Sequence, residues 1–167
     1  IKANIVSKNS TDLMMEKIYE TYGRIDLIIN CTSTKIIPIK HRKSKWKDFN
    51  SQIETHVKGT FNIINSSYDY FKINNGGKII NILSQYIDSP TNDLHHYVVG
   101  KSALSSYIKS VVPELAAHGI IINSVSPGLT NTDQTVNLPE GYKVLSIAKS
   151  PLKRLCSKKD IANAILD

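Results

Sequence analysis

A tyrosine and a lysine four residues apart are the side chains of this sequence best suited to proton chemistry. Tyr97 and Lys101 fall in a segment with helical periodicity, so we expect both side chains on one helix face. An ammonium group close to a phenol favours the phenolate and lowers the pKa of the phenol. The pair is therefore a candidate for exchanging a proton with a substrate oxygen near neutral pH.

Spacing alone does not identify this pair, because Tyr68 and Lys72 have the same spacing. With this many tyrosines and lysines, about one Tyr-x-x-x-Lys match is expected by chance. Tyr68 and Lys72 lie near the end of a long predicted helix, with no polar strand end at a suitable distance before them. We interpret Tyr68 as a core residue and Lys72 as a surface residue.

The composition is that of one globular domain, with 167 residues, 41% hydrophobic and 21% charged. No run approaches eighteen apolar residues and the first residues lack a signal-peptide pattern. We therefore expect a soluble, cytoplasmic protein with no membrane partner. Cys31 and Cys156 are far apart and in no metal-ligand spacing, so we expect reduced thiols and no metal site.

The formal net charge is +7, and residues 35–47 carry six cations and no acid. Such a run is usually a solvated loop, and less often it docks an anionic partner such as an acidic carrier protein or a CoA tail. The sequence has no interleaved aromatic pattern or zinc spacing, so we do not expect a nucleic-acid partner.

Helical and apolar segments alternate along the chain, which predicts an α/β fold with a doubly wound, Rossmann-like parallel sheet. Ser10 or Thr11 is expected to cap the first helix, and Gly23 to end it. A capping box at Ser157–Asp160 predicts the start of the last helix. The expected strands are 25–29, 78–83 and 120–125, and the nearly continuous apolar run at 25–29 is typical of a strand covered on both faces. The expected longer helices are 49–71 and 96–117.

Polar or turn-forming residues follow each of these strands. Asn30, Ser84 and Pro127–Gly128 come directly after the three apolar runs. Ligands of such sheets bind beyond the carboxyl ends of the strands. The sequence therefore predicts a site where these residues converge.

Around these residues the chain resembles the classical short-chain dehydrogenases/reductases, particularly the 3-oxoacyl-carrier-protein reductase branch. Residues 77–84 (GKIINILS) resemble the strand that ends in the catalytic serine, thirteen residues before Tyr97, and residues 97–104 (YVVGKSAL) resemble the catalytic helix. Residues 123–128 (NSVSPG), with Thr132, resemble the nicotinamide-side motif. Segments 151–154 and 160–162 also match, so the similarity covers nearly the whole chain.

The resemblance implies an oxidoreductase that uses NADP(H) or NAD(H) to interconvert a carbonyl and a secondary alcohol. Tyr97 would be the general acid or base, Ser84 would hydrogen-bond the substrate oxygen, and Lys101 would lower the Tyr97 pKa and hold the nicotinamide ribose. The substrate would be a small carbonyl compound, free or bound to a carrier or CoA, and the protein a homodimer or homotetramer. The implied cofactor-binding residues are Asn4, Asn30, Thr32, Tyr97, Lys101, Pro127, Gly128, Thr130 and Thr132.

The sequence departs from the family pattern at several positions. His56 stands where the family has the asparagine of a catalytic tetrad, and it is expected either to hydrogen-bond a relay water or to be an ordinary helix-face residue. Asn30 is followed by Cys-Thr-Ser instead of Asn-Ala-Gly, which puts bulk near the cofactor. Asn4 replaces an adenine-contacting aspartate, and either an adenine contact or a surface role is open. Pro113 is expected to kink the catalytic helix or remove a hydrogen bond.

The eight glycines include no Gly-x-Gly phosphate loop. The resemblance places Ile1 near the third strand of the family fold. We therefore expect residues 1–167 to form a single partial domain, the catalytic half, without the first two strands and the last one. The protein is then a fragment of a reductase, a natural truncation, or a non-catalytic homologue that acts as a binding protein. The retained Ser84, Tyr97 and Lys101 favour the first. The strand at 25–29 should leave an apolar open edge.

Overall fold

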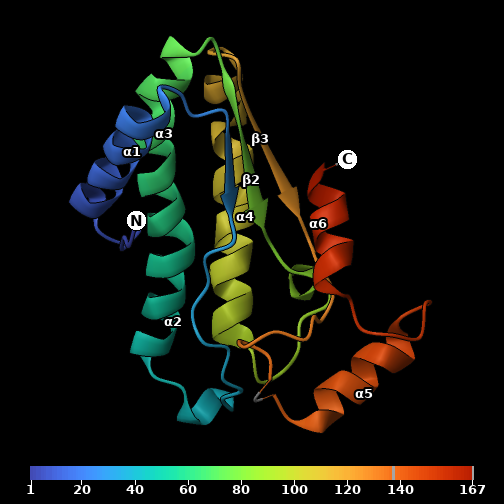
Figure 1. Ribbon diagram of the computed structural model, residues 1–167. Helices are drawn as coiled ribbons and strands as arrows, with labels where there is room; N and C mark the ends of the chain where they lie inside the picture. Colours follow the sequence, from blue (N-terminus) through green and yellow to red (C-terminus); the bar gives the residue numbers. More distant parts are fainter. Residues whose placement is uncertain (137, 167) are drawn as a thin grey trace.

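The computed structural model describes residues 1–136 and 138–166, and these residues form an α/β domain around a parallel sheet (Figure 1). The sheet has the order β1 (Leu27–Asn30), β2 (Gly77–Ile82), β3 (Ile120–Val125), with Ile28 beside Ile79 and Ile79 beside Ile122. The parallel sheet with helical crossovers confirms the predicted fold class.

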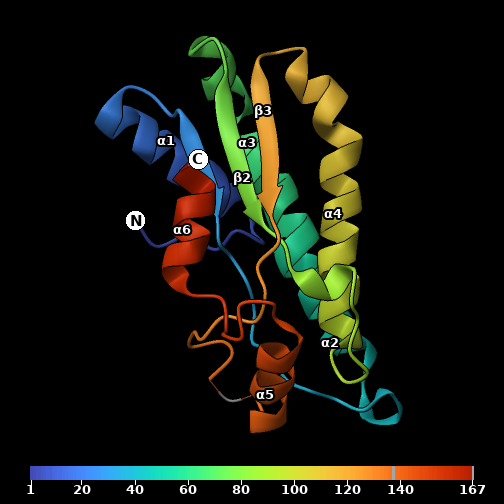
Figure 2. The ribbon, with the colours of Figure 1, turned by 90° about the vertical axis from the view of Figure 1, so that its right-hand side faces the viewer.

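Helices cover the two faces of the sheet unequally. Figures 1 and 2 show α1, α3 and α4 on one face and α6 on the other. No helix of the described ranges is both long and apolar enough to span a bilayer. The helices are α1 (Lys8–Tyr22), α2 (Trp46–Ile53), α3 (Gly59–Ile73), α4 (His95–Ala116), α5 (Glu140–Lys149) and α6 (Lys158–Leu166), with the short turns η1 (His41–Lys43), η2 (Glu54–Lys58) and η3 (Gln85–Ile87).

The hydrophobic core lies between the sheet and the helices α3 and α4. Ile79 and Ile122 on the inner face of the sheet pack against Phe71, Leu104 and Ile108 of the helices. Each such side chain stabilises the fold by about 1.5–3 kcal/mol relative to exposure. This packing fixes the position of α4 along the sheet, and therefore which of its turns lies at the carboxyl ends of the strands.

The ends of the helices partly agree with expectation. Ser7, rather than Ser10 or Thr11, caps α1: its side chain accepts from the Ser10 backbone N–H, and the buried Thr11 hydroxyl donates to the Ser7 carbonyl at 2.9 Å. Gly23 ends α1 with φ of 72°, as predicted. The last predicted cap is also present, since the Ser157 N–H donates to Asp160 at 2.8 Å and the Asp160 N–H donates to Ser157 at 3.1 Å.

The long amphipathic helix is interrupted where the sequence predicts continuity. Between α2 and α3, the turn η2 is a π-helix in which the Gly59 N–H donates to the Glu54 carbonyl. The His56 carbonyl instead accepts from the Thr60 hydroxyl at 2.7 Å. Such wide turns are frequent at functional sites. The α4 helix runs on through Pro113 to Ala116.

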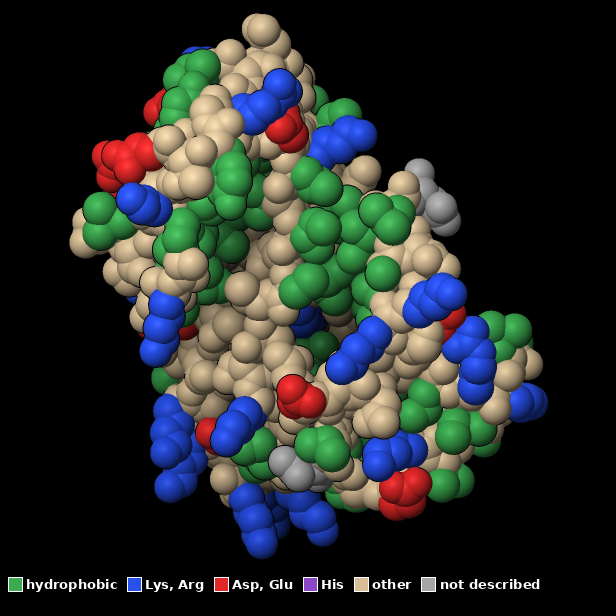
Figure 3. All heavy atoms as spheres, in the orientation of Figure 1, with side chains coloured by type: hydrophobic (Ala, Val, Ile, Leu, Met, Phe, Trp, Pro, Cys, Tyr) green, Lys and Arg blue, Asp and Glu red, His purple; other side chains and the backbone are tan. Residues whose placement is uncertain are grey.

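One face of the sheet is more exposed than the apolar strands predict. Leu27 is 46% exposed, Ile29 is 44% exposed and Ile121 is 51% exposed, all on the face away from α3 and α4. The expectation that β1 is covered on both faces is therefore wrong for this face. Figure 3, which views the molecule from the side of β1, shows hydrophobic side chains gathered over its middle.

We expect these 167 residues, expressed alone, to self-associate through this apolar face and the β1 edge. Light scattering after size exclusion measures the effect. Ile29→Lys should reduce association because it places a charge on the open face. Val144→Lys, at a 57% exposed position on α5, is the matched control and should not. A stable monomer of the unmodified chain would contradict this prediction.

We also expect Gly76→Ala to destabilise the fold by about 1–3 kcal/mol. Gly76 has φ of 125°, and an added Cβ would lie 2.6 Å from the Gly119 carbonyl oxygen, which is backbone and cannot rotate away. Gly141→Ala is the control, since nothing lies within 4 Å of its Cβ position in α5. Urea denaturation of the complete gene product measures both. Equal stabilities of the two variants would refute the argument.

Candidate active site

The carboxyl ends of β2 and β3 are joined by backbone hydrogen bonds that continue past the strands. The Leu83 N–H donates to the Val125 carbonyl at 2.8 Å, and the Gln85 N–H donates to the Pro127 carbonyl at 3.0 Å. Ser84 lies between them and caps η3, its hydroxyl accepting from the Tyr86 N–H at 3.2 Å. Ser84 and Pro127–Gly128 are thus brought to one edge of the sheet.

Tyr97 and Lys101 project from the first turns of α4 toward this edge. Tyr97 is 6% exposed and Lys101 is 3% exposed. The Lys101 ammonium donates to the Ile82 carbonyl at 2.6 Å and lies 6.0 Å from the centre of the Tyr97 ring. The Ser84 side chain lies close enough to the Tyr97 phenol to influence its pKa. The structure therefore brings Ser84, Tyr97 and Lys101 together.

The electrostatics of the pair differ from the expectation drawn from spacing. Burial raises the pKa of Tyr97, and the neighbouring Ser84 side chain offsets the rise only in part. Burial also lowers the pKa of Lys101 to about 8, with a small opposing effect from Cys31. The prediction that Lys101 lowers the Tyr97 pKa toward neutrality is wrong for this arrangement, because the ammonium is turned to the Ile82 carbonyl and desolvation dominates.

His56 lies inside the site and not on an exposed helix face. It is 1% exposed, its ring centre is 6.0 Å from that of Tyr97, and its Nε2 is 3.1 Å from Oε1 of Gln52. Burial, followed by the charge of Lys101, lowers the pKa of His56 to about 3. His56 is therefore neutral at any working pH.

Gly100 allows α4 to approach this region closely. A Cβ on Gly100 would lie 2.8 Å from Cβ of Gln52 and 3.2 Å from Cδ2 of His56. The glycine sits between Tyr97 and Lys101 in the sequence. Its lack of a side chain lets both neighbours face the π turn.

A buried polar network joins the π turn to the sheet. The Asn30 amide donates to the Thr60 hydroxyl at 2.9 Å and to Oδ1 of Asn81 at 3.0 Å, and its oxygen accepts from the Thr32 backbone at 3.2 Å and from the Thr32 hydroxyl. The Asn30 side chain is thereby saturated. The structure gives it a role in holding the strands and α3, and leaves its amide no group for a ligand.

Sequence reasoning missed Gln52, Thr60 and Asn81. Gln52 and Thr60 lie four residues before and after His56, which puts all three on one helix face and is a detectable signal. Asn81 is a polar residue inside an apolar strand, which is a second signal. Its Nδ2 is buried and has no hydrogen-bond partner among the described residues.

The remaining residues implied as cofactor contacts lie in turns. The Thr130 hydroxyl donates to the Gly128 carbonyl at 3.0 Å, and the Thr132 hydroxyl is 3.2 Å from that of Thr135, so both threonines shape the loop after β3. Asn4 is exposed, and its side-chain oxygen accepts from the Val6 N–H at 3.1 Å. Asn4 therefore organises the turn before α1.

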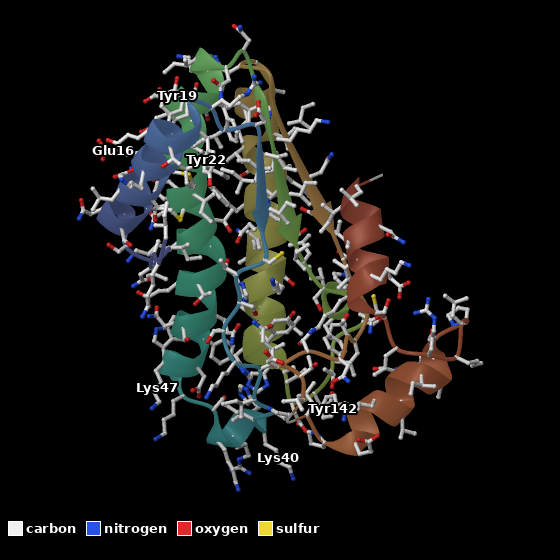
Figure 4. The ribbon with its side chains drawn as sticks, in the orientation of Figure 1. Glu16, Tyr19, Tyr22, Lys40, Lys47 and Tyr142 are labelled. Carbon is white, nitrogen blue, oxygen red and sulfur yellow. The ribbon has the colours of Figure 1, made fainter. Side chains whose placement is uncertain are left out.

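A cavity of about 930 Å³ adjoins Ser84 without including it. It begins at Gln85 and Gly128 and runs beneath α5, which covers it like a lid. The side chains of Tyr86 and Ser146 are neighbours, as are those of Tyr142 and Thr91, so α5 lies against the loops beyond the sheet. Figure 4 shows Tyr142 on the inner side of this lid.

The second tyrosine–lysine pair has none of these surroundings. Tyr68 packs on the core and edge-on against His118, while Lys72 is exposed and lies 5.5 Å from the Tyr68 ring. This placement agrees with their interpretation as core and surface residues.

Comparison with known proteins gives consistent matches over the chain. The family model described as enoyl-(acyl carrier protein) reductase matches residues 1–166. Three proteins named 3-oxoacyl-[acyl-carrier-protein] reductase FabG are similar. The one from Buchnera aphidicola subsp. Baizongia pistaciae is 32% identical over 99% of this chain and 67% of the relative. The one from Staphylococcus aureus N315 is 28% identical over the same shares, and the one from Thermotoga maritima is 27% identical over 98% and 66%.

The chain thus spans about two thirds of the length of the curated relatives it matches. The matched region includes the sheet, α4 and α5. With the family model covering nearly every residue, the chain belongs to the short-chain dehydrogenase/reductase family of oxidoreductases.

Proposed function

We propose that the protein is a nicotinamide-dependent oxidoreductase that interconverts a carbonyl and a secondary alcohol. The observation that carries this proposal is the convergence of Ser84, Tyr97 and Lys101 at the carboxyl ends of the strands. The lining of the cavity under α5 begins at Gln85, the residue that follows Ser84. NADP(H) or NAD(H), when bound, supplies the hydride. The chain's own residues supply the proton and the orientation.

The fit to this cofactor is good at its nicotinamide end. The Lys101 ammonium has three N–H groups and uses one on the Ile82 carbonyl, which leaves donors for the hydroxyls of a ribose. Lys101 and Tyr97 would hold that ribose, and Pro127–Gly128 would lie on the nicotinamide side. The sequence holds no Gly-x-Gly loop, so these residues serve only this end of the dinucleotide.

In the reduction, the Tyr97 hydroxyl donates its proton to the carbonyl oxygen, and the reverse transfer accompanies alcohol oxidation. The raised pKa of Tyr97 keeps the phenol protonated, which suits the acid role. The Ser84 hydroxyl hydrogen-bonds the same substrate oxygen and holds it near the phenol. His56 fills the space beside Tyr97 and keeps a neutral ring against Lys101.

The substrate class follows from the cavity and the charge around it. The space under α5 suits a carbonyl compound of moderate size, free or as an acyl thioester on a carrier or CoA. The exposed cations of residues 35–47 favour an anionic carrier, and Lys40 and Lys47 point outward at this end of the molecule (Figure 4). We further propose a cytoplasmic homodimer or homotetramer.

A non-catalytic binding protein is the second candidate. One observation favours it: the Asn30 side chain is spent within the fold and offers nothing to a cofactor. Under this alternative neither NADPH nor NADH would shift the melting temperature of the complete gene product.

Tyr97→Phe should lower kcat by about 10²–10⁴-fold, because the proton donor is lost while the ring still fills its buried position. NADPH and NADH oxidation with ketones and 3-oxoacyl thioesters measures this in the complete gene product. Tyr68→Phe is the matched control and should keep full activity. Turnover by Tyr97→Phe at the unmodified rate would sink the proposed mechanism.

The free energy of unfolding should rise between about pH 8 and pH 10. Lys101 has a pKa of about 8 when folded, below its unfolded value, so the unfolded state binds more protons in this range. One such group contributes at most about 1.4 kcal/mol per pH unit. Tyr97 acts in the opposite direction only above its unfolded pKa of about 10. Denaturant titrations at several pH values measure the slope.

Lys101→Met should remove this rise, whereas Lys72→Met, at an exposed site, should leave it in place. A rise that persists in Lys101→Met would show that another group is responsible.

A further inference from the structure

Gln52 lies one helical turn before His56 and is only 2% exposed. Its side-chain Oε1 and His56 Nε2 are 3.1 Å apart, and neither side chain has free access to water. Two buried polar atoms at this distance must form a donor–acceptor pair, since an unmatched contact costs about 1–3 kcal/mol.

Two arrangements satisfy such a contact. Neutral imidazole carries its proton on one nitrogen and a lone pair on the other, and a glutamine amide presents an acceptor oxygen or, when flipped, a donor nitrogen. Either His56 Nε2–H donates to the Gln52 oxygen, or the flipped amide donates to an unprotonated Nε2. The orientation of the amide therefore decides the tautomer of the histidine.

The Lys35 carbonyl selects between the two. The Gln52 amide nitrogen lies 3.5 Å from the Lys35 oxygen, a long and weak hydrogen bond. Flipping the amide would replace this bond by two carbonyl oxygens facing each other. The loop carbonyl thus keeps the nitrogen of Gln52 toward Lys35 and its oxygen toward His56.

We propose that Gln52 is a positioning residue that fixes His56, whose ring lies beside that of Tyr97, with its proton on Nε2 and its Nδ1 left as a hydrogen-bond acceptor. Nδ1 receives no hydrogen bond from any described side chain. The catalytic consequence rests on the proposed function: with Nδ1 as an acceptor, the ring offers the site a lone pair that can take an O–H of water. A proton on Nδ1 would instead add a donor to a site where the charge of Lys101 already acts on the ring.

The tautomer is measured directly by long-range proton–nitrogen NMR of the complete gene product labelled with ¹⁵N-histidine. The sequence has five histidines, and the signal lost in His56→Asn identifies His56. We expect a neutral ring protonated at Nε2. Gln52→Met keeps the volume but removes the acceptor, so the His56 signals should move toward a mixture of tautomers.

The kinetics supply a readout that a merely structural role would not move. Gln52→Met should lower kcat by about tenfold with little change in KM, the usual size of effect when the partner that orients a histidine is lost. Gln52→Glu puts a carboxylate opposite the N–H and favours the imidazolium, despite the charge of Lys101. Activity of Gln52→Glu should then fall on acidification through a new apparent pKa that the unmodified protein lacks.

A proton on Nδ1 in the unmodified protein, or an unchanged tautomer in Gln52→Met, would overturn the proposal. If Gln52→Met fails to fold, the NMR signals and pH profile of Gln52→Glu decide the matter. A tautomer that follows Gln52, in a protein that reduces no carbonyl, supports the positioning and overturns the proposed function instead.

Discussion

The hydrogen bonds of Asn30 to Thr60 and Asn81 join two strands and a helix at a point from which water is excluded. Because most buried polar groups in a protein are paired, few arrangements of these three residues are available. Thr60 extends the network to the π turn, since its hydroxyl also donates to the His56 carbonyl. The sheet thereby positions His56. The neutral ring of His56 in turn forms part of the surroundings of Tyr97 and Lys101.

The second constraint is the close approach of α4 to the π turn. Gly100 makes room for Gln52 and His56 at distances that a methyl group would forbid. Lys101 then lies at the end of β2, where its ammonium donates a hydrogen bond to the Ile82 carbonyl. With a pKa of about 8, this buried lysine is only partly protonated near pH 8. The charge of the site therefore depends on which groups complete the hydrogen bonds of Lys101.

Much of this arrangement was predictable from the sequence, because its signals are local. Strand ends, helix periodicity and the spacing of Ser84 to Tyr97 gave the sheet, the catalytic helix and the edge where they meet. The π turn was not predictable, since the apolar pattern of residues 49–71 is equally compatible with a continuous helix. Nor was the spent side chain of Asn30, which depends on partners 30 and 51 residues away. The direction of the Tyr97 pKa shift was not predictable either, because four-residue spacing shows proximity but not desolvation.

The raised pKa of Tyr97 bears on how the site works. Spacing suggests a tyrosine made acidic by a neighbouring cation. In the structure, Tyr97, Lys101 and His56 are buried together, and burial shifts the pKa of each toward its neutral form. A low-polarity cluster of this kind costs less to desolvate than three charges would. It also strengthens each hydrogen bond that a bound ligand adds, because the surrounding dielectric is low. A ligand that engages the remaining Lys101 donors would favour the charged ammonium, and with it a more acidic Tyr97. In this arrangement, ligand binding would lower the pKa of Tyr97, which burial in the fold alone keeps raised.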